Sequence, residues 1–167
     1  MKTPRFRAKR ITRTYRQTIQ AVPEVIFPLL CPVREAEWLD GWRYTMVYSK
    51  SGVVEKGAVF STQGEGEEQT TWIVTKHDQK THEVEFARFT PNSRTCVLMI
   101  AINSKDEVNS FVDISYTYTA TTPAGNDFID RFSEEAFLVA VTFWEKSMNH
   151  FLKTGDKFIA QHSHISR

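Results

Sequence analysis

Arg88 is the residue whose type and position in this sequence best suit ligand chemistry. It alternates with Val84 and Phe86 in a stretch that reads as a strand, so the three side chains are expected on one face. A guanidinium among apolar side chains needs a partner, and Arg88 could hold a carboxylate or an enolate oxygen through two parallel hydrogen bonds. The alternative is that Arg88 pairs with an acid at the rim or reaches solvent past the end of the strand.

Two tyrosines could add hydroxyl groups to a neighbouring part of the same surface. Tyr116 and Tyr118 are in phase with Val112 and Ile114 in the clearest period-2 alternation of the chain. Their hydroxyls could hydrogen-bond a ligand or polarise a carbonyl group. They could equally be core tyrosines whose hydroxyls are already hydrogen-bonded.

Recognisable catalytic and metal-binding motifs are missing from the sequence. It has no nucleophile elbow, no phosphate-binding glycine loop and no HExxH. Cys31 and Cys96 match no metal-ligand spacing and lie among apolar residues, so we expect buried free thiols. His162 and His164 form only a weak metal pattern near the C-terminus. We therefore predict no metal and no cofactor, and the catalytic residues, if there are any, stay unknown.

The composition is that of an ordinary soluble domain of 167 residues, 41% of them hydrophobic and 25% charged. Residues 1–23 carry seven bases and no acid, with few interleaved aromatic residues. This segment could contact nucleic acid or anionic lipid, but it reads better as solvated, so no nucleic-acid partner is predicted. No apolar run approaches the roughly 20 residues of a membrane span, and no signal-like apolar region follows the first bases. With so few cysteines, these features predict a cytoplasmic protein without stable membrane insertion.

The elements that must position the candidate residues follow from hydrophobic periodicity. Strands are predicted over residues 10–21, 42–49, 57–62, 70–77, 83–90, 95–103 and 107–121. Two very short helices are predicted between the first two strands, because Pro23 and Pro32 suit first helical positions and Gly41 ends the second helix. One long helix, over residues 126–154, closes the domain. This order predicts an α+β fold in which a curved sheet grips the final helix.

Aromatic side chains on the expected inner surface are further candidate ligand contacts. Trp38 and Trp42 flank Gly41 and could border the mouth of a cavity or plug the end of the core. The other candidates are Tyr44, Met46, Phe60, Trp72 and Phe86 from the strands, and Phe132, Val139 and Phe143 from one apolar stripe of the final helix. They would either fill the interior completely or leave an apolar pocket of roughly several hundred Å3.

Several stretches resemble the START-like (SRPBCC, helix-grip) superfamily of lipid-transfer proteins, plant pollen allergens and polyketide cyclases. They are residues 23–42, Gly57-x-x-Phe60, residues 71–78, residues 83–86, and the long helix with Phe128, Phe132, Phe143 and Trp144. Together they cover roughly residues 10–155. The resemblance implies a seven-stranded antiparallel sheet curved around the C-terminal helix, with two small helices at one end and a ligand in the tunnel between. It transfers no catalytic residue.

We therefore expect a helix-grip domain over residues 10–155, preceded by a basic, flexible arm over residues 1–9 and followed by a frayed tail over residues 156–167. The first functional hypothesis is the binding of a small hydrophobic or amphipathic molecule. The second is a polyketide cyclase-like or dehydratase-like enzyme, with Arg88 and Tyr116 stabilising an enolate. The third is a protein-interaction module without a ligand. The sequence leaves open whether the protein is a monomer or a homodimer.

Overall fold

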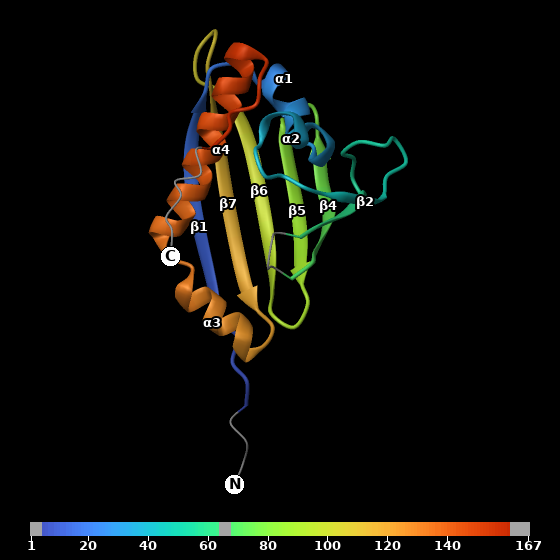
Figure 1. Cartoon of the computed structure of the whole chain (residues 1–167), viewed down its shortest axis with the longest axis vertical. Helices are drawn as coiled ribbons and strands as arrows, with labels where there is room; N and C mark the ends of the chain where they lie inside the picture. Colours follow the sequence, from blue (N-terminus) through green and yellow to red (C-terminus); the bar gives the residue numbers. More distant parts are fainter. Residues whose placement is uncertain (1–4, 64–67, 161–167) are drawn as a thin grey trace.

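Seven antiparallel strands form one curved sheet, and a long helix packs along it (Figure 1). The computed structural model describes residues 5–63 and 68–160. The strands are β1 (Arg10–Ile19), β2 (Thr45–Tyr48), β3 (Val59–Thr62), β4 (Thr70–Asp78), β5 (Glu83–Thr90), β6 (Arg94–Ser104) and β7 (Ser110–Ala120), in the order β1-β7-β6-β5-β4-β3-β2. The helices are α1 (Pro23–Ile26), the 3₁₀ turn η1 (Phe27–Leu29), α2 (Pro32–Trp38), α3 (Pro123–Arg131) and α4 (Glu134–Thr154). The predicted fold class is confirmed.

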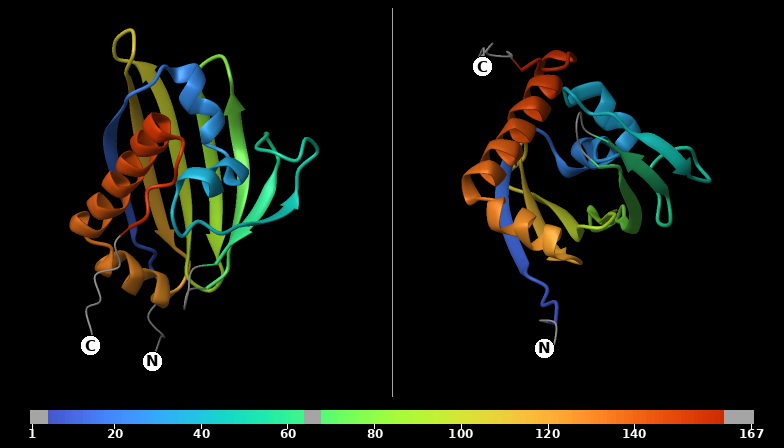
Figure 2. Two further views of the ribbon diagram at one scale, coloured as in Figure 1. Left: turned by 45° about the horizontal axis from the view of Figure 1, so that its top comes forward. Right: turned by 60° about the horizontal axis from the view of Figure 1, so that its bottom comes forward.

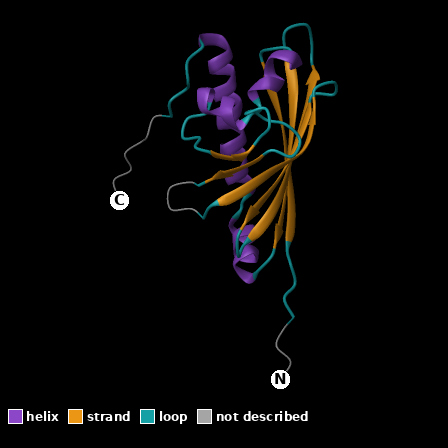
Figure 3. Cartoon of the chain, turned by 90° about the vertical axis from the view of Figure 1, so that its right-hand side faces the viewer, coloured by secondary structure: helices purple, strands orange, loops and turns teal. Residues whose placement is uncertain are grey.

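The helices gather on one face of the sheet and leave the other uncovered (Figure 3). The strands curve around the interior, and the short helices lie across the end of the sheet next to the C-terminal part of α4 (Figure 2). Strand alternation directs Val112, Ile114 and Tyr118 of β7 inward, and all three are buried. The concave face of the sheet therefore supplies side chains both to the apolar core and to the wall of any internal cavity.

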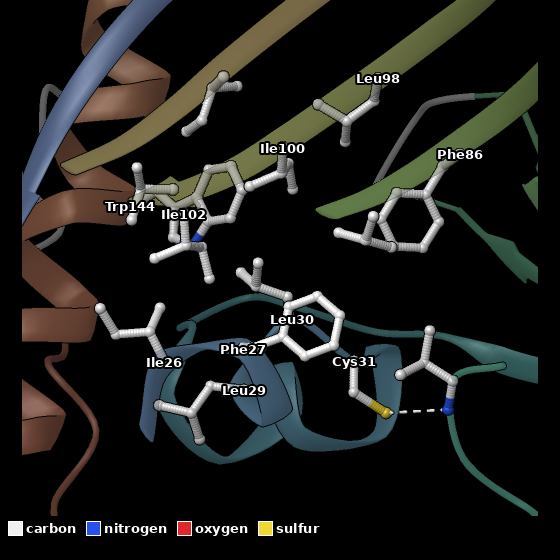
Figure 4. Close-up of a cluster of buried hydrophobic side chains, with 14 of the residues drawn as sticks. Ile26, Phe27, Leu29, Leu30, Cys31, Phe86, Leu98, Ile100, Ile102 and Trp144 are labelled. Atoms are coloured by element: carbon white, nitrogen blue, oxygen red, sulfur yellow. Dashed lines mark hydrogen bonds between the residues drawn. The ribbon is translucent and has the colours of Figure 1, made fainter. Parts of the chain in front are cut away.

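The helical corner between β1 and β2 is built by its prolines. Pro23 and Pro32 occupy the first turns of α1 and α2, where the missing N–H costs no intrahelical bond. Pro28 falls in the 3₁₀ turn, which joins the two short helices. The corner directs apolar side chains such as Leu30 toward β5 and β6 (Figure 4), and the Cys31 sulfur accepts a hydrogen bond from the backbone N–H of Val54 (3.3 Å).

The long final helix predicted over residues 126–154 is two helices. The hydroxyl of Ser133 accepts a hydrogen bond from the N–H of Ala136 (3.1 Å), and acidic Glu134 and Glu135 follow in the first turn of α4. These are the features of a helix start, so the chain ends α3 at Arg131 and begins a second helix. The sequence prediction failed here because the apolar periodicity continues across the break.

Side-chain hydrogen bonds hold helix α4 against β1, the strand at the free edge of the sheet. The N–H of Thr18 donates to the Glu145 carboxylate (2.7 Å), and the Asn149 amide donates to the Thr18 carbonyl (3.0 Å). The buried amide of Gln17 donates to the Val141 carbonyl (2.9 Å). The two bonds to Thr18 satisfy edge groups that have no partner strand, and the Gln17 bond ties β1 to the backbone of α4.

Both ends of the described chain contact the domain. The Asn126 side chain accepts a hydrogen bond from the N–H of Lys9 (2.8 Å) and donates one to the carbonyl of Arg7 (3.0 Å). Phe158 forms a parallel bridge with Leu39 of the α2–β2 connection. Residues 1–4 and 161–167, and with them the two histidines of the weak metal pattern, lie outside the described residues, so the flexible arm and the frayed tail stay predictions.

Gly125 lies where α3 packs closely against the turn between β5 and β6. A Cβ atom at this buried position would lie 1.9 Å from the backbone oxygen of Ser93. Alanine in place of glycine normally stabilises a helix, by about 1 kcal/mol. We expect the reverse for Gly125→Ala, a loss of about 1–3 kcal/mol in the free energy of unfolding, because backbone must move to admit the methyl group.

Chemical denaturation would measure this loss, with the exposed neighbour Ala124 as the matched control position. The change Ala124→Ser should leave the unfolding midpoint nearly unaltered. A Gly125→Ala protein as stable as the original would show that α3 does not pack against the β5–β6 turn in this way.

Candidate functional site

Two adjoining cavities lie between the concave face of the sheet and α4. The outer one measures about 580 Å3 and the inner one about 70 Å3. They share four lining residues, Leu39, Trp42, Tyr116 and Trp144, so they form one interior site with a wide outer part and a narrow inner part. The outer volume falls within the usual range of small-molecule pockets, roughly 300–1,000 Å3.

Arg88 on β5 supplies a positive charge to the outer cavity. Its guanidinium lies 4.8 Å from the ring centre of Trp72 on β4, and 5.4 and 5.2 Å from those of Tyr116 and Tyr118 on β7. It donates a hydrogen bond to the Tyr118 hydroxyl and another to the Cys96 sulfur. Within the described part of the chain, no carboxylate forms an ion pair with it. The structure therefore does not show the rim ion pair considered for Arg88, and the side chain is partly rather than fully exposed.

The surroundings of Arg88 keep it charged and keep its neighbours neutral. Burial alone would lower the pKa of the Arg88 guanidinium, but the Tyr118, Cys96 and Tyr116 groups around it raise that pKa overall. Burial raises the pKa of both tyrosine hydroxyls, and it also raises the pKa of the Cys96 thiol. A thiol that keeps its proton is a poor nucleophile, so Cys96 is suited to packing and weak hydrogen bonding.

Glu35 on α2 supplies a carboxyl group to the inner cavity. Part of its surface stays accessible because it borders the cavity, while protein atoms enclose the rest of the side chain. This burial raises the pKa of the Glu35 carboxyl to about 8, so the group is mostly protonated at neutral pH. Across residues 5–63 and 68–160, no side chain hydrogen-bonds to it or forms an ion pair with it.

Glu35 was missed by the sequence reasoning although a signal for it exists. Trp38 and Leu39 follow it at three and four residues along α2 and the turn after it, so the three share one helical face. Trp38 is fully buried and Leu39 lines both cavities. A carboxyl group on such an apolar face must itself be turned inward.

Most of the sequence-predicted site residues line the interior. The outer cavity is lined by Trp42, Arg88, Tyr116, Phe132 and Phe143, and the inner cavity by Trp42, Phe60, Trp72, Phe86 and Tyr116. Trp38 lines neither, because it is fully buried, stacks on Trp144 and donates its indole N–H to the Leu29 carbonyl (3.1 Å). Tyr44 and Met46 pack against the core without reaching either cavity.

The prediction that Val139 faces the cavity is wrong, because its side chain is 64% exposed. Phe137, Val141 and Trp144 form the stripe of α4 that faces the interior. Val139 follows Phe137 by two residues, which is roughly 200° around a helix, so it lies on the opposite face. Of the three helix candidates in the predicted stripe, Phe132 and Phe143 therefore line the outer cavity and only Val139 does not.

Other hollows of the described structure lie outside this interior. One of about 560 Å3 crosses the uncovered face of the sheet, where Arg16 and Asp113 already form an ion pair (2.7 Å). Another of about 460 Å3 lies beside the helical corner, where the rings of His77 and His82 pack on Phe27. The described residues include no group of His, Cys, Asp or Glu suited to a metal ion. The interior site is the better candidate because, within residues 5–63 and 68–160, Arg88 has no carboxylate partner and the Glu35 carboxyl has no side-chain partner.

The ionisation of Glu35 should make the stability of the protein depend on pH. In the folded protein the carboxyl keeps its proton up to about pH 8, whereas in the unfolded chain it loses the proton near pH 4.5. The folded state binds more protons between these values, so raising the pH through this window lowers the free energy of unfolding. Glu35→Gln cannot ionise, and above pH 8 it should be more stable than the original by roughly 2–4 kcal/mol. At about 1.4 kcal/mol per pKa unit the shift sets an upper limit of about 5 kcal/mol, and the partial exposure of the carboxyl lowers that value.

Urea denaturation at a series of pH values would measure this difference, which should shrink toward zero below pH 4.5. Glu37→Gln is the matched control, because Glu37 lies on the same helix but is exposed and pairs with Arg34. Parallel pH profiles for the original protein and Glu35→Gln would contradict the inward placement of this carboxyl.

Comparisons with known proteins bear on the fold. No family model and no curated protein sequence matches the chain. Norcoclaurine synthase from Thalictrum flavum superposes with a TM-score of 0.65 at 10% identity, over 92% of this chain and 97% of that one. Ara h 8.0201 gives a TM-score of 0.62 at 12% identity, over 87% of this chain and 99% of that one. DynU16, from the dynemicin biosynthetic locus, gives 0.59 at 12% identity, over 87% of this chain and 48% of that one.

These identities are too low to carry an activity, but the superpositions cover nearly the whole domain. The superposed region includes the curved antiparallel sheet, the helical corner and the C-terminal helix, since it spans 92% of this chain for the norcoclaurine synthase. The chain therefore has the helix-grip fold of START-like proteins, as its sequence resemblance implied.

Proposed function

We propose that the protein binds a small amphipathic molecule in the interior site, with an anionic group of the ligand against Arg88. The observation that carries this proposal is a guanidinium turned into a cavity without a carboxylate partner in the described part of the chain. A partly buried charge without a counter-charge is costly, and a ligand carboxylate would offset that cost through charge-assisted hydrogen bonds. Such a ligand completes the electrostatics of the site.

The walls of the cavity define the rest of the ligand. Trp42, Phe137 and Trp144 offer apolar and aromatic surface, and burial of apolar ligand surface contributes about 25 cal/mol per Å2. One structure of the norcoclaurine synthase has dopamine and hydroxybenzaldehyde bound, so this fold can accommodate small aromatic molecules. We infer that an aromatic acid matches the site better than a long acyl chain, because the inner cavity is short.

Fewer observations support the other two functional hypotheses. An enzyme of the cyclase kind would use the same guanidinium to hold an enolate, but binding of an anion comes first in either case. A ligand-free interaction module is not supported, because the interior is hollow rather than filled.

No helix in the described ranges is long and apolar enough to span a bilayer. The buried, unpaired thiols of Cys31 and Cys96 support the proposed cytoplasmic location.

Isothermal titration calorimetry with two naphthalene probes tests the role of Arg88. The anion 2-naphthoate should bind, and its neutral analogue 2-acetylnaphthalene should bind about ten- to a hundredfold more weakly, which is the range expected for hydrogen bonds to a charged group. The change Arg88→Met should remove this preference, because it should weaken the binding of 2-naphthoate and leave the binding of 2-acetylnaphthalene unchanged. The preference depends on charge rather than shape, because the two probes are nearly isosteric.

Arg16→Met is the matched control, since Arg16 lies on the uncovered face of the sheet with Asp113. It should leave both affinities unchanged. The proposal fails if 2-naphthoate does not bind, or if Arg88→Met folds normally and still prefers the anion.

A further inference from the structure

The carboxyl of Glu35 and the indole N–H of Trp144 are polar groups of the interior that the proposed anion at Arg88 leaves without a role, and of the two Glu35 can change its charge. It lines the inner cavity, whose volume of about 70 Å3 suits a group of two or three heavy atoms, since a water molecule takes roughly 30 Å3. The other residues that line this cavity are apolar or aromatic, and Tyr116 is the one with a hydroxyl among them. A ligand group that entered here would meet Glu35.

The charges around Glu35 come from few elements. On its own helix, Arg34 is already paired with Glu37 (2.7 Å). From the sheet, Tyr116 on β7 faces it and has a raised pKa, while Arg88 on β5 lies beyond Tyr116 in the outer cavity. Helix α4 presents Trp144, which does not titrate, at this point. Hence nothing in the described structure supplies a direct cationic partner for Glu35.

We propose that Glu35 donates a hydrogen bond to a neutral carbonyl oxygen of the ligand whose anionic group contacts Arg88. The inference rests on the proposed function and narrows its ligand class to flat aromatic acids with a ketone or similar oxygen at the opposite end. A cationic group at that end is disfavoured because the Glu35 carboxyl keeps its proton at neutral pH and offers no negative charge there. The raised pKa supports the assignment, because a protonated carboxyl has the O–H that a carbonyl needs as donor.

Titration of 6-acetyl-2-naphthoate against 2-naphthoate tests the inference. Both probes carry the anion, and they differ only in the acetyl group that would enter the inner cavity. The acetyl probe should bind about three- to tenfold more tightly at pH 7, the usual range for one hydrogen bond between neutral groups. This advantage should disappear in Glu35→Leu and persist in Glu35→Gln, because the glutamine amide also donates.

The pH series on the original protein gives a second readout that needs no variant. The advantage of the acetyl probe should decline as the pH rises through about 8, where Glu35 loses its proton, whereas in Glu35→Gln it should stay constant. Glu37→Leu, an exposed change on the same helix, should alter neither probe.

The outcomes separate the inference from the proposal beneath it. Equal binding of the two probes, or an acetyl advantage that survives Glu35→Leu and high pH, overturns the role of Glu35 and leaves the anion site at Arg88 standing. Binding of neither probe overturns the proposed function, and the inference with it. Tighter binding of the acetyl probe with the stated pH dependence supports both.

Discussion

The attachment of α4 to the free edge of β1 determines where the interior of this protein is hollow. An edge strand exposes N–H and C=O groups that need partners, and here Glu145 and Asn149 of α4 supply them to Thr18. Because these bonds have a fixed geometry, the helix cannot slide toward the centre of the sheet. The space opposite β5 and β6 is left to side chains alone, and the side chains there do not fill it.

The helical corner closes the end of this space and brings a polar group into it. Trp38 stacks on Trp144 with ring centres 6.1 Å apart, so α2 and α4 are joined across the end of the sheet. The same helix carries Glu35 three residues before Trp38, and the packing of the indole turns the carboxyl inward. The proline at the start of α2 and the tryptophan at its end thus place Glu35, although neither touches a ligand group in our proposal.

The sequence predicts the sheet well because a period of two residues leaves little freedom. Arg88 must share a face with Phe86, and the structure places both on the cavity wall. The helix is harder to predict, because the attachment through Gln17 and Glu145, which sets how α4 is turned toward the sheet, joins residues far apart in the chain. Tyr44 has the expected phase but precedes β2, whose pairing with β3 is irregular, and no local pattern reveals whether such a residue fills core or borders a cavity.

The two polar ends of the interior have opposite formal charges but do not neutralise each other. Arg88 lies in the outer cavity and Glu35 in the inner one, with Tyr116 on the wall that both cavities share. Bringing both into a buried ion pair would require two desolvated charges, and the carboxyl instead keeps its proton near neutral pH. At pH 7 the site therefore carries a net positive charge, which favours anions. As the pH passes about 8 the Glu35 carboxylate forms inside the site, and the preference of the site for anions weakens.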